Sequence, residues 1–346
     1  MLQGQPLPAN IAIFAAAAAA VWIAGHALAR DADELAERTG LGSAFVGLVL
    51  LAAATELPEI ATTSTAAIAG KPSLVLGNMF GGITMQTAIL ALADATVVRG
   101  VLTRYPRKPV HALEATMLIA LLSILLGVCV FGDAELAFGI GGGAILLAAI
   151  YVFAVWLLRR YDEDSDWVPL DLPDLPDVDQ RPNHAPQPGQ TARSLALRMT
   201  GFSLVILACG VGLVWSADAI ADQTGLGTSF VGSTVLAAST SLPEVSTTIA
   251  AARLGAYTMA ISNIFGSNLI MLALLLPADA MYREGPLLAQ AGRAEMLTLV
   301  AGIVVTAIYV AGLLVRRKPQ ILGMGADSAC VAVVYLASLV MLYALR

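Results

Sequence analysis

The chain carries the sequence ATELPE at residues 54–59 and a related sequence, STSLPE, at residues 239–244. Both lie in the middle of apolar runs that are long enough to cross a bilayer. A charge at that depth costs at least about 2.5–3.5 kcal/mol, so ionisable residues there usually face a cavity and bind or relay an ion. Each proline removes a backbone donor and interrupts its helix, which frees carbonyl groups and leaves a half-helix N-terminus beside a glutamate. The two motifs therefore predict an ion site inside a membrane.

The composition is that of a polytopic membrane protein. Of the 346 residues, 58% are hydrophobic and only 13% are charged, whereas soluble proteins average about 25% charged residues. The formal net charge of -6 gives no reason to expect a nucleic-acid partner. The cysteines and histidines are dispersed without metal-ligand spacing, so a zinc site is not expected. We expect the lipid bilayer and inorganic cations as partners, with no protein partner and no cofactor.

Hydropathy and helix breakers predict an all-α integral membrane protein with ten transmembrane helices, of which the second and seventh are broken by Pro58 and Pro243. Residues 159–193, between the fifth and sixth helices, are rich in aspartate and proline. Such a segment buries too little apolar surface to fold, so it is interpreted as a flexible linker. The predicted spans are residues 9–29, 41–69, 72–98, 109–131, 134–158, 195–217, 227–252, 256–280, 292–315 and 325–345.

The two halves of the chain are copies of one unit. A gapless shift of 185 positions places residues 41–95 on residues 226–280 with many identities, several of them polar. Chance similarity between apolar helices would not keep polar positions in register over such a length. The sequence therefore predicts two five-helix repeats, residues 1–158 and 194–346. The matched pairs include Thr39 and Thr224, Pro58 and Pro243, Glu59 and Glu244, Thr62 and Thr247, Asn78 and Asn263, and Asp94 and Asp279.

Because five is odd, the two repeats must enter the membrane from opposite sides. With the N-terminus outside, 15 of the 19 lysines and arginines fall on the inner side, as the positive-inside rule requires. The sequence therefore predicts both termini outside and the acidic linker in the cytoplasm, in a plasma membrane of the prokaryotic inner-membrane type. Inverted repeats with interrupted helices are typical of secondary transporters, whose site lies near the bilayer midplane. The four basic residues left outside are Lys71, Arg283, Arg293 and Arg346.

The predicted site offers only oxygen ligands. Carboxylate, hydroxyl and amide oxygens suit hard cations, and the six to eight flexible oxygen ligands of Ca²⁺ fit this set best. The two asparagines have an alternative role in hydrogen bonding between helices, and Glu56 could instead line the entrance. Asp94 and Asp279 fall near span ends, where solvated acids are common, and are expected to be structural. The candidate ligands are Glu56, Glu59, Glu244, Thr55, Thr240, Ser241, Ser267, Gln86, Asn78 and Asn263, with the three glutamates as metal ligands.

A resemblance to a known family follows from these motifs. The two Leu-Pro-Glu sequences, the segments GNMFGG at 77–82 and SNIFGSN at 262–268, and the five-plus-five duplication resemble the alpha repeats of the calcium/cation antiporter superfamily, which includes sodium/calcium and calcium/proton exchangers. The resemblance implies alternating-access antiport in which Glu59 and Glu244 are shared by Ca²⁺ and the counter-ion. It also implies that the first and sixth helices slide to expose the site to each side in turn. Thr55, Thr240, Ser241 and Ser267 match polar ligands of the family.

Three positions depart from the sodium/calcium exchanger pattern. Glu56 stands where a serine is usual, Gly82 replaces the serine matched by Ser267, and Met271 occupies a position that is usually acidic or amide. Gly82 and Met271 each remove an oxygen that a Na⁺ site would use. Glu56 adds a carboxylate that like-charge repulsion and burial favour in its protonated form. Both H⁺ and Na⁺ therefore stay open as the counter-ion.

Other functions fit these residues less well. Exchange of another cation, such as Mg²⁺, K⁺ or Na⁺ for H⁺, stays open because the site is altered. An intramembrane carboxylate protease would need facing aspartates, whereas the mid-span acids are glutamates beside prolines. A channel is disfavoured by the inverted repeats and by the lack of a filter-like loop. We therefore predict a secondary active cation antiporter, most consistent with Ca²⁺ transport, and not an enzyme.

Overall fold

The computed structural model describes residues 4–38, 55–98, 100–106, 109–137, 139–164 and 191–345. Residues 41–54 of the predicted second span and residues 165–190 of the predicted linker lie outside the described residues. Within the described ranges the protein is built from helices and two short β-hairpins. Eight of these helical segments are long and apolar enough to cross a membrane.

In the first half of the chain, prolines and glycines set the helix ends. Pro58 and Pro72 lie in the first turns of α3 and α4, where the missing N–H would have no helical partner in any case. Gly132, at φ +89°, ends α5. The predicted fifth span begins too early, because residues 135–141 form a hairpin and α6 begins only at Gly142. The elements are α1 (Leu7–Arg38), α3 (Leu57–Ile68), α4 (Pro72–Thr96), η1 (Leu102–Arg104), α5 (Val110–Phe131), β1 (Glu135–Ala137), β2 (Ile140–Gly141) and α6 (Gly142–Asp164).

The second half repeats this order with more interruptions. Thr191 caps α7 by accepting a hydrogen bond from the N–H of Ser194 (3.2 Å), and Gly225 follows the last turn at φ +67°. Where one span is predicted over residues 227–252, short helical segments follow one another, with a turn at Ser241. The elements are α7 (Ala192–Thr224), α8 (Thr228–Val231), the π-helix η2 (Gly232–Leu236), α9 (Ala237–Thr240), α10 (Leu242–Arg253), α11 (Tyr257–Ala273), α12 (Leu275–Met281), η3 (Leu287–Gln290), α13 (Arg293–Leu314), β3 (Gln320–Ile321), β4 (Met324–Gly325) and α14 (Ala326–Ala344).

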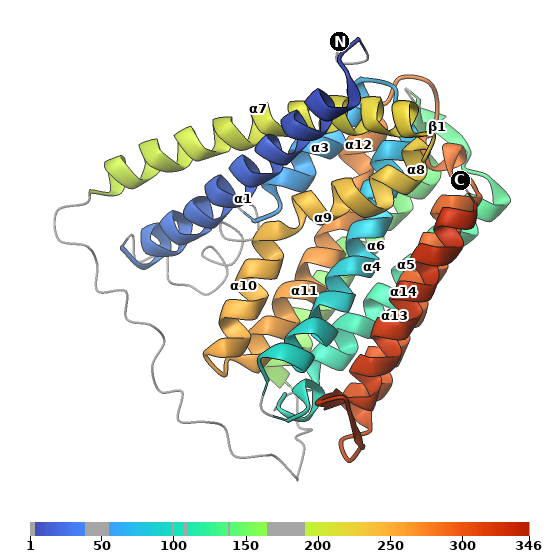
Figure 1. Cartoon of the computed structure of the whole chain (residues 1–346). Coiled ribbons are helices and arrows are strands. Elements are labelled where there is room, and N and C mark those ends of the chain that lie inside the picture. Colours follow the sequence, from blue (N-terminus) through green and yellow to red (C-terminus); the bar gives the residue numbers. More distant parts are fainter. Residues whose placement is uncertain are drawn as a thin grey trace.

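Helices α1 and α7 lie against each other at one side of the other helices (Figure 1). Each crosses a helix of the opposite repeat at a glycine. A Cβ on Gly25 of α1 would lie 2.8 Å from Pro243 Cγ in α10, and a Cβ on Gly210 of α7 would lie 2.7 Å from Ala61 Cβ in α3. Gly25 and Gly210 are 185 positions apart, so the repeat relation extends to these crossings. Small residues are required there because the backbones approach so closely.

Helix α4 forms the centre of the bundle. In the most apolar 18-residue stretch of α4, 89% of the residues are buried, whereas the corresponding share in α14, at the periphery, is 22%. Glycines allow α4 to pack closely on the start of the seventh predicted span: a Cβ on Gly77 would lie 3.1 Å from the carbonyl oxygen of Ser229, and a Cβ on Gly232 would lie 3.4 Å from the Cα of Gly77. These contacts bring α4 close to the segment that leads into the second Leu-Pro-Glu motif.

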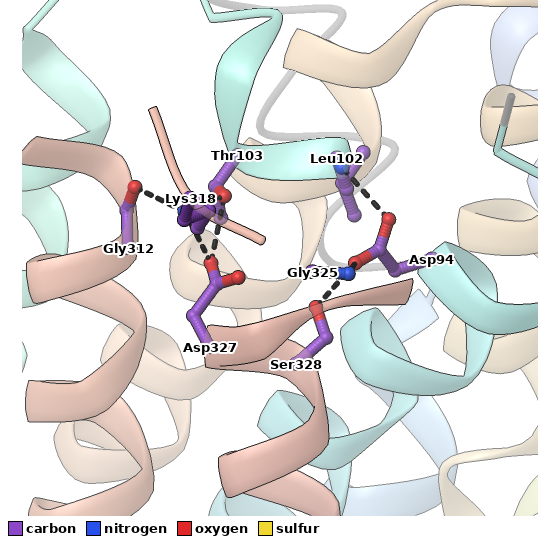
Figure 2. Close-up of polar contacts among 8 residues, drawn as sticks. All are labelled: Asp94, Leu102, Thr103, Gly312, Lys318, Gly325, Asp327 and Ser328. Carbon is purple, nitrogen blue, oxygen red and sulfur yellow. Dashed lines mark hydrogen bonds and ion pairs between the residues drawn. The ribbon is translucent and has the colours of Figure 1, made fainter. Parts of the chain in front are cut away.

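Two buried aspartates tie the repeats to each other. Asp94 Oδ1 accepts a hydrogen bond from the N–H of Leu102 (2.8 Å), and its Oδ2 accepts from Gly325 N–H (2.9 Å) and Ser328 Oγ (2.6 Å) in the other repeat (Figure 2). Asp279, in the second repeat, makes the equivalent contacts to the first repeat. It accepts from the N–H groups of Leu287 (2.6 Å) in its own repeat and Gly141 (2.7 Å) in the other.

These contacts fit the predicted structural role of the two aspartates, although neither is solvated: Asp94 is 0% exposed and Asp279 is 1% exposed. A carboxylate can be buried when backbone N–H groups satisfy it. The Asp94 contact lies near the C-terminal end of α13, whose Gly312 neighbours Asp327, and the Asp279 contact lies near its N-terminal end through η3. A helix of 22 residues spans about 33 Å, so the two ties sit at opposite ends of the bundle.

Candidate cation site

Three glutamate side chains converge between the two repeats. Glu56 precedes α3, Glu59 lies in its first turn, and Glu244 lies in the first turn of α10. Carboxylate oxygens from all three lie within 4.8 Å of one another, and each residue is at most 1% exposed. Each Leu-Pro-Glu sequence begins a helix, because proline is favoured in the first turn. The glutamates are therefore held at two helix N-termini, where the helix dipole favours negative charge.

Most of the carboxylate oxygens have no hydrogen-bond partner among the described residues. Burying a polar group without a partner costs about 1–3 kcal/mol, and more for a charged group. The described residues do not compensate for this cost. An arrangement of buried, unpaired oxygens with one charge sign is suited to a cation or to protons. These atoms are both oxygens of Glu56, both oxygens of Glu244 and Oε2 of Glu59, together with Ser267 Oγ and Gln86 Oε1.

One glutamate is held by a chain of hydrogen bonds that crosses between the repeats. Gln86 Nε2 in α4 donates to Ser241 Oγ (3.1 Å), and Ser241 Oγ donates to Glu59 Oε1 (3.3 Å). Gln86 Nε2 also approaches Met271 Sδ in α11 at 3.8 Å. We call Glu59, Ser241, Gln86 and Met271 the Glu59 network. The repeat shift maps Gln86 onto Met271 and Glu56 onto Ser241. The equivalent positions around Glu244 are therefore occupied by a thioether in place of the Gln86 amide and by a carboxylate in place of the Ser241 hydroxyl.

The two predicted asparagines hold equivalent positions in the two repeats. Asn78 Nδ2 donates to Thr62 Oγ1 (3.2 Å), and Thr62 Oγ1 donates to the carbonyl of Pro58 (2.9 Å). Asn263 Nδ2 donates to Thr247 Oγ1 (3.1 Å), which donates to the carbonyl of Pro243 (3.1 Å). These links connect α4 to the first Pro-Glu turn and α11 to the second. The interhelical role expected as an alternative for the asparagines is therefore present in the geometry.

The remaining predicted ligands are buried around the glutamates. Asn78 Oδ1 accepts from Thr240 Oγ1 (3.3 Å), so both ends of the Asn78 amide are engaged. Thr55, immediately before Glu56, is 5% exposed. Ser267 lies beside Glu56. The structure thus brings candidate residues from α3, α4, α9, α10 and α11 to one region.

Asn268 is a buried polar residue outside the set of predicted ligands. It is 0% exposed, its Nδ2 donates to Thr87 Oγ1 (3.2 Å) in α4, and its Oδ1 has no hydrogen-bond partner among the described residues. It follows Ser267 directly in the SNIFGSN segment. The signal that could have identified it is an amide in the middle of an apolar span, which is costly unless it is paired.

Known proteins resemble this chain over most of its length. Residues 9–158 and 194–344 match the family model described as sodium/calcium exchanger protein. A protein named "Putative antiporter CaxA" from Alkalimonas amylolytica is 26% identical over 300 residues, which covers 85% of this chain and 88% of that protein.

Two solved structures share the fold. The H⁺/Ca²⁺ exchanger CAX aligns with a TM-score of 0.68 at 13% identity, covering 97% of this chain and 85% of its own. The sodium-calcium exchanger NCX_Mj aligns with a TM-score of 0.55 at 16% identity, covering 97% of this chain and 99% of its own. Because the family model covers most of the sequence, the chain belongs to the sodium/calcium exchanger protein family, a family of integral membrane antiporters rather than enzymes.

Proposed function

We propose that this protein is a secondary active antiporter that moves Ca²⁺ across the membrane in exchange for H⁺ or Na⁺. The observation that carries the proposal is that one carboxylate oxygen from each of Glu56, Glu59 and Glu244 lies within 4.8 Å of the others, and that five oxygens of these carboxylates have no hydrogen-bond partner among the described residues. Ca²⁺ binds oxygens at about 2.3–2.6 Å, so oxygens on opposite sides of one ion are separated by roughly 5 Å. The three carboxylates are therefore spaced to bind one divalent cation together, and no resident cofactor is needed.

The proposed architecture is two inverted five-helix repeats, residues 1–158 and 194–346, joined by the acidic linker 159–193. Its ten helices include two that are broken at Pro58 and Pro243. Support comes from the two aspartate ties, which are equivalent under the repeat shift and lie at opposite ends of the bundle. The termini lie towards one end of the bundle (Figure 1), as expected if both are outside and the linker is cytoplasmic.

Exchange follows from competition for the same oxygens. Three buried carboxylates this close together repel one another strongly unless a cation or protons reduce their charge. Ca²⁺ arriving from one side displaces the counter-ion, and the counter-ion arriving from the other side displaces Ca²⁺. Because both cannot be bound at once, the movement of one is coupled to the return of the other.

Access to the two sides would alternate by movement of the α1 and α7 pair. This pair contacts the Pro-Glu helices at Gly25 and Gly210. Because glycine has no side chain, no side chain of the pair obstructs sliding at these two crossings. It also carries polar contacts at its ends: Asp31 of α1 pairs with Arg198 of α7 (3.1 Å), and Asp218 of α7 pairs with Lys71 before α4 (3.0 Å). The first pair joins the two helices to each other, so they would move as one body.

The test is ⁴⁵Ca²⁺ uptake into proteoliposomes that contain the purified full chain, with a pH gradient and a Na⁺ gradient imposed separately. Uptake driven by at least one gradient, and abolished in Glu59→Gln, is the expected result. Uptake that needs neither gradient and does not saturate would indicate a channel. The absence of uptake under both gradients would remove Ca²⁺ as the substrate; Mg²⁺ and K⁺ competition would then be measured against the same site.

A further inference from the structure

Resting on the proposed function, we infer that two polar contacts hold the α1 and α7 pair in its present position, so that the protein rests in one of its two access states. One contact is the ion pair between Asp218 of α7 and Lys71 before α4 (3.0 Å). The other is the hydrogen bond that Trp22 Nε1 of α1 donates to Ser246 Oγ of α10 (2.6 Å). Each contact joins a helix of the pair to a part of the bundle outside it. We call these two contacts the latch.

The pair does not cross the two repeats at equivalent positions. Gly25 of α1 crosses α10 at Pro243, and Gly210 of α7 crosses α3 at Ala61. The repeat shift maps Gly25 onto Gly210, but it maps Pro243 onto Pro58. Pro58 precedes Ala61 by three residues, which corresponds to about 4.5 Å along an α-helix. The α7 crossing is therefore displaced by nearly one turn from the position equivalent to the α1 crossing.

The two crossed helices run toward opposite ends of the bundle, which we call the η1 end and the η3 end after the short helices there. Helix α3 runs toward the η3 end: a Cβ on Gly70, just after α3, would lie 3.2 Å from Oε1 of Glu284, which precedes η3. Helix α10 runs toward the η1 end, because Tyr257, which begins the next helix, packs on Tyr105 directly after η1, with 4.2 Å between the ring centroids.

Both helices of the pair are therefore displaced in the same direction. Ala61 lies further along α3 than Pro58, so α7 crosses closer to the η3 end. Pro243 precedes Ser246, the equivalent of Ala61, in a helix that runs the other way, so α1 also crosses closer to the η3 end. Because the repeats are inverted, the second access state follows when they exchange these arrangements. The pair would then slide by about 4.5 Å toward the η1 end.

The ion pair of the latch belongs to the present state only. A slide of about 4.5 Å would carry Asp218 away from Lys71, whose side chain is 32% exposed and can turn to solvent. After the exchange, the residues placed like Asp218 and Lys71 would be Asp33 and Ala256. Alanine carries no charge, so the second state has no equivalent ion pair.

The hydrogen bond of the latch is also specific to the present state. Its donor, Trp22, is 47% exposed, and lipid cannot supply another acceptor for the indole N–H. After the exchange, the residues placed like Trp22 and Ser246 would be Leu207 and Ala61, which have no polar side-chain atoms. Both latch contacts therefore favour the position near the η3 end, and both are lost when the pair slides.

The test measures the position of the pair by double electron–electron resonance between spin labels, on the purified full chain in Ca²⁺-free lipid nanodiscs. The three native cysteines are replaced by alanine. Labels at Thr224→Cys on α7 and Leu254→Cys after α10, two exposed residues at opposite ends of the bundle, should approach each other by up to about 4.5 Å in the slid state. Labels at Leu197→Cys and Ala289→Cys, both exposed, should move apart by a similar distance.

The labelled protein with an intact latch should show mainly one distance for each label pair. We expect Lys71→Met to raise the fraction of the slid state about fivefold and Trp22→Phe to raise it about threefold. The combined variant should multiply the two effects, and Lys71→Asp/Asp218→Lys should reverse the effect of the lost pair. Asp31→Asn breaks the ion pair inside the moving body, so this matched control should leave the fraction unchanged.

Three results would overturn the inference. The first is an unchanged fraction in both Lys71→Met and Trp22→Phe; a change in only one of them would remove the other contact from the latch. The second is equal populations while the latch is intact, and the third is an equally large change in Asp31→Asn. Failure of the proposed function is distinguishable, because it appears as absent ⁴⁵Ca²⁺ uptake by the unsubstituted protein under both gradients, whereas the label distances are read without transport.

Discussion

The two repeats agree in their framework and differ at the site. Both carry an aspartate that reaches into the other repeat, an asparagine–threonine link to the Pro-Glu turn, and a glycine crossing. At the site, the repeat shift pairs Glu56 with Ser241 and Gln86 with Met271, so the two repeats carry different side chains at these positions. Glu59 of the first repeat accepts a hydrogen bond from Ser241, whereas neither oxygen of Glu244 has a hydrogen-bond partner in the part of the chain that the structure describes. The repeats thus share most of the contacts that hold the bundle together, whereas they differ at residues around the glutamates.

The framework also differs at one end. Lys318 donates to Asp327 Oδ2 (2.7 Å) and to Thr103 and the carbonyl of Gly312, next to the Asp94 tie (Figure 2). Its repeat counterpart is Asp133, which accepts a hydrogen bond from the N–H of Gly143 (2.8 Å) at the start of α6. At one end of the bundle the equivalent position is a lysine, Lys318, that pairs with the carboxylate of Asp327. At the other end it is an aspartate, Asp133, that accepts from the N-terminus of α6. Both solutions satisfy a charged group, but only the first depends on an ion pair.

The largest expected effect is the loss of transport in Glu244→Gln. The substitution removes a charged ligand whose oxygens have no other partner among the described residues, so ⁴⁵Ca²⁺ uptake should fall below detection. Glu284→Gln, in an exposed loop, is the matched control and should retain uptake. If Glu244→Gln transports normally while Glu59→Gln does not, the two glutamates are not equivalent and the comparison between the repeats fails at the site.

The next effect concerns the ion pair found at one end only. Lys318→Met leaves the Asp327 carboxylate buried without its cationic partner and with only the hydroxyl of Thr103 (2.7 Å) still donating to Oδ2 among the described residues, which costs about 3–5 kcal/mol of stability. Lys318→Met/Asp327→Leu removes both charges and should recover most of that loss. Thermal unfolding in detergent, followed by intrinsic fluorescence, measures both. Equal unfolding temperatures for the single variant and the unsubstituted protein would mean that the pair does not contribute to stability.

A smaller effect is expected when the halves of the site are made alike by Gln86→Met. The variant loses the donor to Ser241, so Ser241 no longer orients toward Glu59. Loss of a hydrogen bond that orients a ligand usually costs about 10- to 100-fold in metal affinity, and we expect the low end, about tenfold. Saturation of ⁴⁵Ca²⁺ uptake measures the change. Gln86→Glu keeps an acceptor but no donor, and a loss confined to Gln86→Met would point to side-chain volume rather than to the hydrogen bond.

The smallest expected difference is between the two aspartate ties. Within the described ranges, Asp94 accepts three hydrogen bonds and Asp279 accepts two. Asp→Asn at either position turns an acceptor into an N–H donor that faces a backbone N–H. Because each buried bond contributes about 1 kcal/mol net, Asp94→Asn should destabilise the protein by about 1 kcal/mol more than Asp279→Asn. Unfolding temperatures of the two variants, measured side by side, test this order. An equal or larger decrease for Asp279→Asn would contradict it.

Several features of this protein were predictable from local pattern alone. Hydropathy, the position of Pro58 and Pro243, and the 185-residue shift predict a helical membrane protein, a duplicated unit and an acidic site. These features could be predicted because burial of apolar spans and the cost of a charge in the membrane act residue by residue. Helix ends were less accurate: the hairpin at residues 135–141 was predicted as helix, since its apolar residues do not distinguish a short strand pair from a span.

Only the tertiary structure decided which polar groups are paired. Asp94 and Asp279 were predicted to be structural residues near span ends, but their burial was not predicted, because they accept hydrogen bonds from hairpin residues of the opposite repeat, more than 100 positions away in the sequence. The contact between Gly82 and Met271, and the hydrogen bonds from Gln86 through Ser241 to Glu59, likewise join residues from different repeats. Sequence determined which residues are costly to bury, since that cost belongs to each side chain. Packing between the repeats determined which of those costs are compensated by a hydrogen-bond partner among the described residues and which are not.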